Sequence, residues 1–225
     1  MLYIVSTPIG NLKDITLRAL EVLKTVDLIA CEDTRHTRIL LDHYQIKKPL
    51  TSYHSYNKSS KTQEIIKLLQ EGKNIALVSD AGTPGISDPG VVLVNQAIKD
   101  NIPFTVIPGP SGLISGLVLS GLPTHKFVFE GFLPVKQAAR IRRLKELKPE
   151  KRTIIIYESP HRLIRCLEDM LQVLGDIEIA CLREVTKKFE EARRAEVAQV
   201  LGHFKKIAPK GEFILVLNLY LTNKK

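Results

Sequence analysis

Short apolar runs alternate with amphipathic stretches along the first half of the chain. The runs have the length of buried strands and lie at residues 3–6, 28–31, 75–79 and 104–107. The stretches between them repeat apolar residues at helical spacing and lie at residues 15–25, 34–41, 63–69 and 91–99. Strands that alternate with helices predict an α/β fold, with a mainly parallel sheet that is covered by helices on both faces.

The second half continues this alternation after a break in the pattern. A helix is expected over residues 112–120, and Gly121-Leu-Pro123 separates it from a new apolar run at 126–132. We therefore place a domain boundary here, between a domain 1–120 and a domain 121–225. The second domain has further predicted strands and helices at 153–157, 162–174, 178–182, 195–206 and 213–220. The expected architecture is two α/β lobes around a cleft.

The composition is that of a soluble globular protein. Of the 225 residues, 44% are hydrophobic, and no apolar run approaches the roughly 20 residues of a membrane span. The chain begins directly with a predicted strand and has no basic leader, so we expect a cytoplasmic protein. Cys31, Cys166 and Cys181 lie in or beside apolar runs, as reduced core thiols do, and the histidines lack the spacing of metal ligands. No bound metal is expected.

The positive charge is concentrated in the second domain. Residues 1–120 contain 12 Lys and Arg against 11 Asp and Glu, a net charge of +1, whereas residues 121–225 contain 21 against 13, a net charge of +8. Basic residues are densest over 136–152, where apolar residues also recur at helical spacing. Such an amphipathic helix has either a solvated basic face or a face that neutralises the phosphates of a nucleic acid.

Residues 79–90 form a turn-rich segment directly after a predicted buried strand. Their sequence, Ser-Asp-Ala-Gly-Thr-Pro-Gly-Ile-Ser-Asp-Pro-Gly, excludes a helix or a central strand because of its glycines and prolines. Ligands of open α/β sheets bind at the carboxyl ends of the strands, where such loops lie. Gly82 and Gly85 allow close backbone approach, and Asp80 and Asp88 add two carboxylates. The segment is either a ligand-binding loop or a turn capped by its own Asp residues.

Other predicted strands end in similar polar or turn-rich segments. These are Thr7-Pro-Ile-Gly-Asn11, Cys31-Glu-Asp-Thr-Arg35, Pro108-Gly-Pro-Ser-Gly112 and Tyr157-Glu-Ser-Pro-His-Arg162. Each segment taken alone is explained as a turn or a helix cap. Taken together, they are expected to converge on one crevice.

Six segments, in their order and spacing, resemble one known family over nearly the whole chain. They are residues 2–12, 32–38, 78–90, 129–134, 157–162 and 210–213. They are similar to ribosomal RNA small subunit methyltransferase I, which belongs to the tetrapyrrole methylase superfamily. The resemblance implies two α/β lobes that bind S-adenosylmethionine in the cleft between them, usually as a homodimer. It also implies methylation of the ribose 2′-oxygen of a cytidine in the decoding region of 16S rRNA, as naked RNA or within the small ribosomal subunit.

The resemblance implies which residues meet the cofactor and the RNA. The expected cofactor contacts are Pro8, Gly10, Asp80, Ala81, Gly82, Thr83, Pro84, Pro108, Gly109, Ser111 and Tyr157. The group 183–187 is expected to border the substrate. The expected RNA contacts are Arg140, Arg142, Arg143, Arg162 and Arg183.

Methylation of a hydroxyl requires a group that handles its proton. A base, or a cation that stabilises the alkoxide, must lie within about 3 Å of the ribose oxygen. Arg35 and Arg162 suit a phosphate or oxyanion clamp, because a guanidinium fork fits both tasks. The expected catalytic residues are Glu158, Arg35, Lys187 and His161, and the general base stays open among these and Glu32, Asp33, Asp80, Asp88 and Glu184.

Two other functions stay open on the sequence alone. A tetrapyrrole C-methyltransferase would share the cofactor pocket, and its polycarboxylate substrate would also suit a basic lobe. A non-catalytic RNA-binding module accounts for the basic helix but not for several strand-end loops aimed at one crevice. The strings Glu-Asp-Thr-Arg-His-Thr-Arg and Tyr-Glu-Ser-Pro-His-Arg favour rRNA methylation.

Two features depart from the family pattern. Ala195 follows Arg194 where a glycine is expected, so a tight turn at this position would be altered. The chain also ends at Lys225, soon after the last predicted strand. A C-terminal RNA-binding segment of some relatives is therefore expected to be missing.

Overall fold

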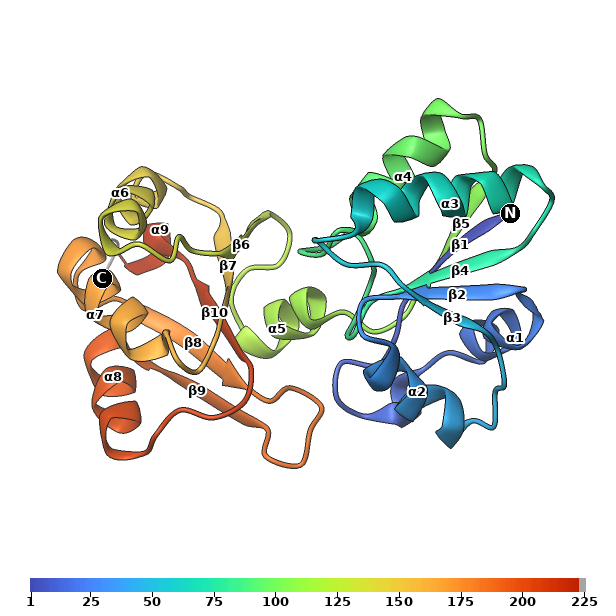
Figure 1. The fold of residues 1–225 in the computed structure, drawn as a ribbon. Helices are drawn as coiled ribbons and strands as arrows, with labels where there is room; N and C mark the ends of the chain where they lie inside the picture. Colours follow the sequence, from blue (N-terminus) through green and yellow to red (C-terminus); the bar gives the residue numbers. More distant parts are fainter. Residues whose placement is uncertain (223–225) are drawn as a thin grey trace. The chain divides into compact units, whose positions relative to one another are not determined.

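The computed structural model describes residues 1–222, and the chain divides into two compact units. The first unit comprises Met1–Ser111 and the second begins at Gly112. Each unit has its own five-stranded sheet with helices packed on it (Figure 1). The expected α/β class is confirmed. The division lies one helix before the expected boundary at residue 120, because helix α5 (Gly112–Ser120) packs on strands of the second unit.

The sheet of the first unit is parallel throughout and has the strand order β3-β2-β4-β1-β5. Its strands are β1 (Leu2–Val5), β2 (Leu28–Cys31), β3 (Leu50–Ser52), β4 (Ile75–Val78) and β5 (Phe104–Ile107). Its helices are η1 (Leu12–Asp14), α1 (Leu17–Thr25), α2 (Thr34–His43), α3 (Lys58–Gln70) and α4 (Gly90–Lys99). The sequence predicted four of these strands and missed β3, whose three residues are too short to show a pattern.

Helices cover both faces of this sheet, as predicted. Helices α1 and α2 pack on one face, and α3 and α4 pack on the other (Figure 1). Alternate residues of a strand therefore enter different cores: Ile29 and Cys31 of β2 pack with α1 and α2, whereas Ala30 packs with α3. All residues of β4 are buried, which explains why the central strand is an unbroken apolar run.

The sheet of the second unit is mixed. Its order is β6-β7-β10-β8-β9, in which β6 and β7 are parallel and the other neighbours are antiparallel. The strands are β6 (Phe127–Phe132), β7 (Thr153–Glu158), β8 (Glu178–Arg183), β9 (Glu191–Glu196) and β10 (Phe213–Leu217). The helices besides α5 are α6 (Gln137–Leu147), α7 (Leu163–Leu174), α8 (Val197–Lys206) and α9 (Leu219–Thr222).

One face of this sheet carries the main core of the second unit. Helices α6, α7 and α8 contribute buried residues such as Leu144, Leu167 and Phe204 to that core. Helix α5 packs against the sheet through Gly116, where an added Cβ would lie 2.9 Å from Cγ2 of Ile214. The glycine therefore allows the helix to approach the strand closely.

Two predicted elements of the second unit differ from the structure. The predicted strand 213–220 ends at Leu217, and a short helix begins at Leu219. The predicted helix 195–206 begins at Val197, because Ala195 and Glu196 end β9. Within residues 1–222, no helix is both long and apolar enough to cross a bilayer.

Candidate functional site

Loops that follow β1, β4 and β5 converge at the carboxyl edge of the first sheet. The backbone N–H groups of Thr7 and Gly82 donate to each other's carbonyl at 2.9 and 3.0 Å, which joins the first two loops. The hydroxyls of Ser6 and Thr83 lie 2.9 Å apart and add a second link. An added Cβ at Gly109 would lie 3.0 Å from Cβ of Ser6, so the third loop also packs closely here. The three expected cofactor loops of this unit therefore meet.

Asp80 and Asp88, the carboxylates of the glycine-rich loop, accept hydrogen bonds from different parts of the chain. Asp80 accepts the backbone N–H of Asp33 at 3.1 Å and thereby ties the loop after β4 to the loop after β2. Asp88 accepts the N–H groups of Gly85 at 2.8 and 2.9 Å and of Gly90 at 2.7 Å. Asp88 thus closes its own turn, and its pKa is raised by burial despite these hydrogen bonds.

Glu32, at the end of β2, lies in a negative environment. Its pKa is raised above the usual value of 4.5 by burial and then by the charges of Asp80 and Asp88, while His54 opposes the shift. The Nδ1 atom of His54 is buried and has no hydrogen-bond partner among the described residues. A carboxyl group with a raised pKa is better suited to accept a proton near neutral pH than an ordinary surface carboxylate.

Arg35 is exposed at the start of α2. Its guanidinium group, with a side chain that is 90% exposed, pairs with Asp33 at 2.8 Å. Asp33 also caps the helix by accepting the backbone N–H of Arg35 at 2.8 Å, and these contacts hold the pKa of Asp33 well below its usual range. Asp33 therefore orients the Arg35 guanidinium on the surface, and most of that group stays exposed to solvent.

Tyr157, near the end of β7, is enclosed by aromatic rings. The rings of Phe129 and Phe132 contact it edge-on, with centroid distances of 4.9 and 5.8 Å. An added Cβ at Gly112 would lie 3.2 Å from the Tyr157 hydroxyl, so this glycine makes room for the phenol. Burial raises the pKa of Tyr157 to about 12, which keeps the hydroxyl protonated at neutral pH.

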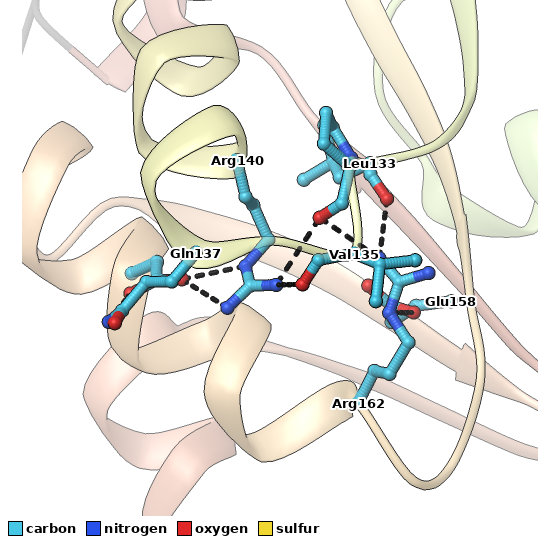
Figure 2. Close-up of polar contacts among 8 residues, drawn as sticks. Leu133, Val135, Gln137, Arg140, Glu158 and Arg162 are labelled. Atoms are coloured by element: carbon cyan, nitrogen blue, oxygen red, sulfur yellow. Dashed lines mark hydrogen bonds and ion pairs between the residues drawn. The ribbon is translucent and has the colours of Figure 1, made fainter.

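Glu158, the last residue of β7, is buried and pairs with Arg162, the partly exposed N-cap of α7 (Figure 2). Oε1 of Glu158 accepts the backbone N–H of Ser159 at 2.8 Å and lies 3.3 Å from Nε of Arg162. The guanidinium of Arg162 donates to the carbonyl of Leu133 as well. The side chain of Glu158 is 0% exposed, so protein atoms enclose this carboxylate, which the sequence predicted to be catalytic. Arg162 is likewise engaged with protein groups.

Arg140 points into the core of the second unit and not to solvent. Its guanidinium lies 2.6 Å from Asp169 and donates to the carbonyls of Pro134, at 3.3 Å, and Val135, at 3.0 Å (Figure 2). Arg140 and Asp169 are 5% and 3% exposed. This corrects the expectation that Arg140 contacts RNA, because protein atoms enclose its guanidinium.

Other basic residues of α6 remain at the surface. Arg142 and Lys145 are exposed, and so is Lys148, the C-cap residue that follows the helix. Arg143 is partly exposed and pairs with Glu130 and, at 2.9 Å, with Glu146. The exposed face of α6 is therefore basic, as predicted, although its arginines are not equivalent.

The group 183–187 is held by ion pairs. Nζ of Lys187 lies 3.0 Å from Glu184 and 2.7 Å from Glu212. Although burial opposes it, hydrogen bonding to these two carboxylates raises the pKa of Lys187, so the amine stays an ammonium group. Arg183 donates to the carbonyl of Lys210 at 2.7 Å and is mostly buried.

Comparison with known proteins identifies the family. Residues 1–201 match the family Tetrapyrrole (Corrin/Porphyrin) Methylases. The chain is 50% identical to ribosomal RNA small subunit methyltransferase I of Thermotoga maritima over 217 aligned residues. These residues are 96% of this chain and 97% of that protein. The chain belongs to the ribosomal RNA small subunit methyltransferase I family. The member from Synechocystis sp. is 52% identical over 218 residues, which are 96% of this chain and 78% of that protein.

A solved structure extends the likeness to the fold of the superfamily. The uroporphyrin-III C-methyltransferase of Thermus thermophilus, complexed with S-adenyl homocysteine, has a TM-score of 0.68 at 15% identity. The likeness covers 97% of this chain and 97% of that chain. At this identity it establishes a shared tetrapyrrole methylase fold.

The predicted site residues differ in their accessibility to solvent. Gly10, Ala81 and Gly109 are exposed at the converging loops, whereas Pro8, Gly82 and Pro84 are buried and shape them. Ser111 and Pro108 lie on the third loop, at the end of the first unit. His161 is exposed between β7 and α7.

The sequence did not predict three residues that contact or lie beside the site residues: His54, Glu212 and Asp169. His54, beside Glu32, follows a strand too short to be predicted, although the polar string Ser52-Tyr-His-Ser-Tyr56 was a signal for a strand end. Glu212 and Asp169 bind Lys187 and Arg140 from distant parts of the chain. No local pattern marks such long-range pairs.

Proposed function

We propose that this protein transfers a methyl group from S-adenosylmethionine to 16S rRNA, at the ribose 2′-oxygen of a cytidine in the decoding region. The observation that carries the proposal is the 50% identity over nearly the full length of a protein named ribosomal RNA small subunit methyltransferase I. The converging strand-end loops support it, because they lie where open α/β sheets bind ligands.

The residues at these loops fit the proposed cofactor. Gly10, Ala81 and Gly109 are exposed and have no bulky side chain, so no side chain covers the loops at these positions; the carbonyl of Ala81 and the backbone of Gly82 are already paired with Ser79 and Thr7. The carboxylates of Glu32 and Asp80 can accept hydrogen bonds from hydroxyl or ammonium groups. S-adenosylmethionine, when bound, supplies an electrophilic methyl group on a sulfonium.

Within this proposal, Glu32 is the first-unit carboxylate best suited to take the proton of the ribose hydroxyl. Its raised pKa favours proton acceptance, whereas the pKa of neighbouring Asp33 is lowered by Arg35. Arg35 is proposed to hold a phosphate of the substrate, because its guanidinium is open to solvent and fixed at one edge by Asp33. Lys187 is proposed as a cation near the substrate and not as a base, since its pKa is raised.

The exposed basic residues of α6 are proposed to bind RNA backbone. Arg142, Lys145 and Lys148 lie on the surface of a unit whose net charge is +8. His161, exposed between β7 and α7, is a further proposed substrate contact. We also propose that the enzyme acts in the cytoplasm as a homodimer and takes its RNA within the small ribosomal subunit.

The test is methyl transfer to small ribosomal subunits. Purified protein is incubated with labelled S-adenosylmethionine and 30S subunits from a strain that lacks the corresponding methylase, and the label is mapped by ribose-methylation-sensitive primer extension. One labelled cytidine 2′-oxygen is the expected result. Label on a base, or on no nucleotide although the protein binds S-adenosylmethionine, contradicts the proposed reaction. A parallel incubation with uroporphyrinogen III tests the tetrapyrrole alternative, for which we expect no transfer.

A further inference from the structure

The loop that joins β8 to β9 carries an aromatic ring into solvent. Residues 184–190 extend beyond the two strands (Figure 1), and Phe189 on this loop is 64% exposed. Nζ of Lys188 lies 5.6 Å from the centroid of the Phe189 ring. Among the described residues Lys188 makes no ion pair with a carboxylate. The loop therefore presents a planar apolar surface and an uncompensated cation side by side.

Several tethers fix this loop without using Phe189. Lys187 bridges Glu184, at 3.0 Å, and Glu212, at 2.7 Å. Oε1 of Glu184 also accepts the backbone N–H of Glu212 at 2.9 Å. At the other end of the loop, Glu190 accepts the N–H of Thr186 at 2.6 Å. Glu184 is thus engaged inside the loop, whereas Glu190 is exposed and, among the described residues, its carboxylate binds only the backbone N–H of Thr186.

The loop holds backbone conformations that cost free energy. Glu184 and Thr186 have φ values of 51° and 69°, in the left-handed region that side chains with a Cβ adopt at a cost of about 1–2 kcal/mol each. Gly211 lies against the Glu184 carboxyl group so closely that an added Cβ would overlap it. The tethers therefore determine the loop conformation, and burial of Phe189 contributes little to it.

We propose that Phe189 is a stacking platform for an unpaired base of the RNA substrate, with Lys188 beside it for the adjoining phosphate. The proposal rests on the proposed function, since it assigns part of the substrate site of the same enzyme. Unpaired RNA bases stack on exposed aromatic rings, and a ring on a fixed loop loses little entropy when a base binds. Charge favours a nucleic acid as the occupant, because the second unit carries a net charge of +8 and Lys188 has no carboxylate partner in the described chain.

The test separates base stacking from phosphate attraction. The full-length protein is titrated with two fluorescein-labelled RNA 12-mers, one of cytidines and one with the same backbone but no bases. Phe189→Leu keeps an apolar side chain without an aromatic face, and Phe189→Tyr keeps the face. We expect Phe189→Leu to bind the cytidine 12-mer about 5- to 100-fold more weakly, as loss of one stacked base predicts, and the abasic 12-mer unchanged. Phe189→Tyr is expected to bind both as the parent does.

Controls decide the outcome. Ile207, another exposed apolar residue of this unit, is replaced by Ala, and this variant is expected to bind both RNAs normally. Equal binding of the two 12-mers by the parent, or an equal loss for both RNAs in Phe189→Leu, overturns the stacking platform.

Methyl transfer to 30S subunits is measured separately. If the parent methylates the subunits and Phe189→Leu retains its KM for them, the stacking proposal fails while the proposed function stands. If Phe189→Leu binds only the cytidine 12-mer more weakly but the parent transfers no methyl group, the stacking platform stands and the proposed function fails.

Discussion

The guanidinium of Arg140 lies 2.6 Å from the carboxylate of Asp169 inside the second unit, and both side chains are almost completely buried. Arg142, two positions along the same helix, is exposed. Asp169 also accepts a hydrogen bond from Gln137 at 3.0 Å, and Arg140 donates to backbone carbonyls before α6. The pair therefore fixes the segment that enters α6, while Arg142 lies on the exposed side of the same helix.

Replacing Arg140 is expected to affect stability and replacing Arg142 to affect RNA binding. Arg140→Met leaves Asp169 as an unpaired buried charge, so the free energy of unfolding should fall by about 3–5 kcal/mol in urea denaturation. The double replacement Arg140→Met with Asp169→Leu should recover most of that loss. Arg142→Gln should leave the unfolding free energy within about 0.5 kcal/mol and lower the salt dependence of RNA binding by about one phosphate contact. An equal loss of stability in both single variants would contradict this division of roles.

Gly211 is expected to be essential because of the Glu184 side chain and not only because of its own backbone. Both Gly211 and Gly175 have positive φ, +86° and +85°, but nothing lies within 4 Å of an added Cβ at Gly175. Gly175→Ala therefore measures backbone strain alone, about 1–3 kcal/mol, because a φ of 85° with a ψ of −173° is a region that is almost restricted to glycine. Gly211→Ala should cost at least about 1 kcal/mol more, because it also displaces the Glu184 carboxylate from Lys187 and Glu212.

A double-mutant cycle distinguishes the two contributions at Gly211. In a Glu184→Ala background the overlapping carboxyl group is absent, so Gly211→Ala should cost less than it does in the parent, by the share that the overlap contributes. The unfolding free energies are measured in urea for all five proteins. Additive costs of Gly211→Ala and Glu184→Ala would show that the two residues do not interact.

The local patterns of the sequence predicted most of the first unit. The apolar runs located β1, β2, β4 and β5 to within a residue or two, and for β1, β2 and β4 the reason is that buried parallel strands require continuous hydrophobic residues. The glycines and prolines of residues 79–90 located the loop after β4, and the structure joins it to the loop after β1 through Thr7 and Gly82. In a parallel sheet, the loops after the strands lie at the same edge. A sequence pattern that locates the strands is therefore enough to predict that these loops lie together.

The sequence patterns gave wrong or missing predictions where contacts with residues far away in the chain determine burial or packing. Arg140 and Arg142 look alike in the basic run 136–152, and only Asp169 on α7 makes one of them a core residue. Strand β9, Glu-Ala-Arg-Arg-Ala-Glu, has no apolar run, since it is an edge strand that pairs with β8 alone. Helix α5 was assigned to the first domain because nothing local shows that Gly116 packs on Ile214.

Two adjacent carboxylates are expected to change stability with pH in opposite directions. The pKa of Glu32 is raised by burial and by Asp80 and Asp88, so its stabilising contribution is present below the usual pKa of 4.5 and is lost as the pH rises through the raised value. The pKa of Asp33 is lowered by Arg35, so its contribution is present above 3.8 and is lost as the pH falls. Glu32→Gln should therefore raise Tm at pH 8 and leave it unchanged near pH 4, whereas Asp33→Asn should lower Tm at pH 8.

The same pair of variants tests the proposed base. If Glu32 accepts the proton of the ribose hydroxyl, Glu32→Gln should lower kcat for methyl transfer by about 10²- to 10⁴-fold while the affinity for S-adenosylmethionine changes little. Asp33→Asn should keep most of the activity, because an Asn side chain still caps α2. Full activity of Glu32→Gln together with the Tm shifts above would show that Glu32 is perturbed by its neighbours but is not the base.

Ala195 is expected to stabilise β9 where relatives are expected to have glycine. Ala195 pairs with Ile179 of β8 in a regular strand, and its side chain packs against the main core of the second unit. Ala195→Gly removes that partly buried methyl group and adds backbone entropy to the unfolded chain, so it should cost about 1–2 kcal/mol of unfolding free energy in urea. Ala192→Gly is the matched control, because Ala192 lies in the same strand but is exposed. It should cost only the backbone part, about 0.5–1 kcal/mol. Equal costs at the two positions would mean that the Ala195 methyl group contributes nothing to the core, and a gain of stability in Ala195→Gly would mean that the strand strains at this residue.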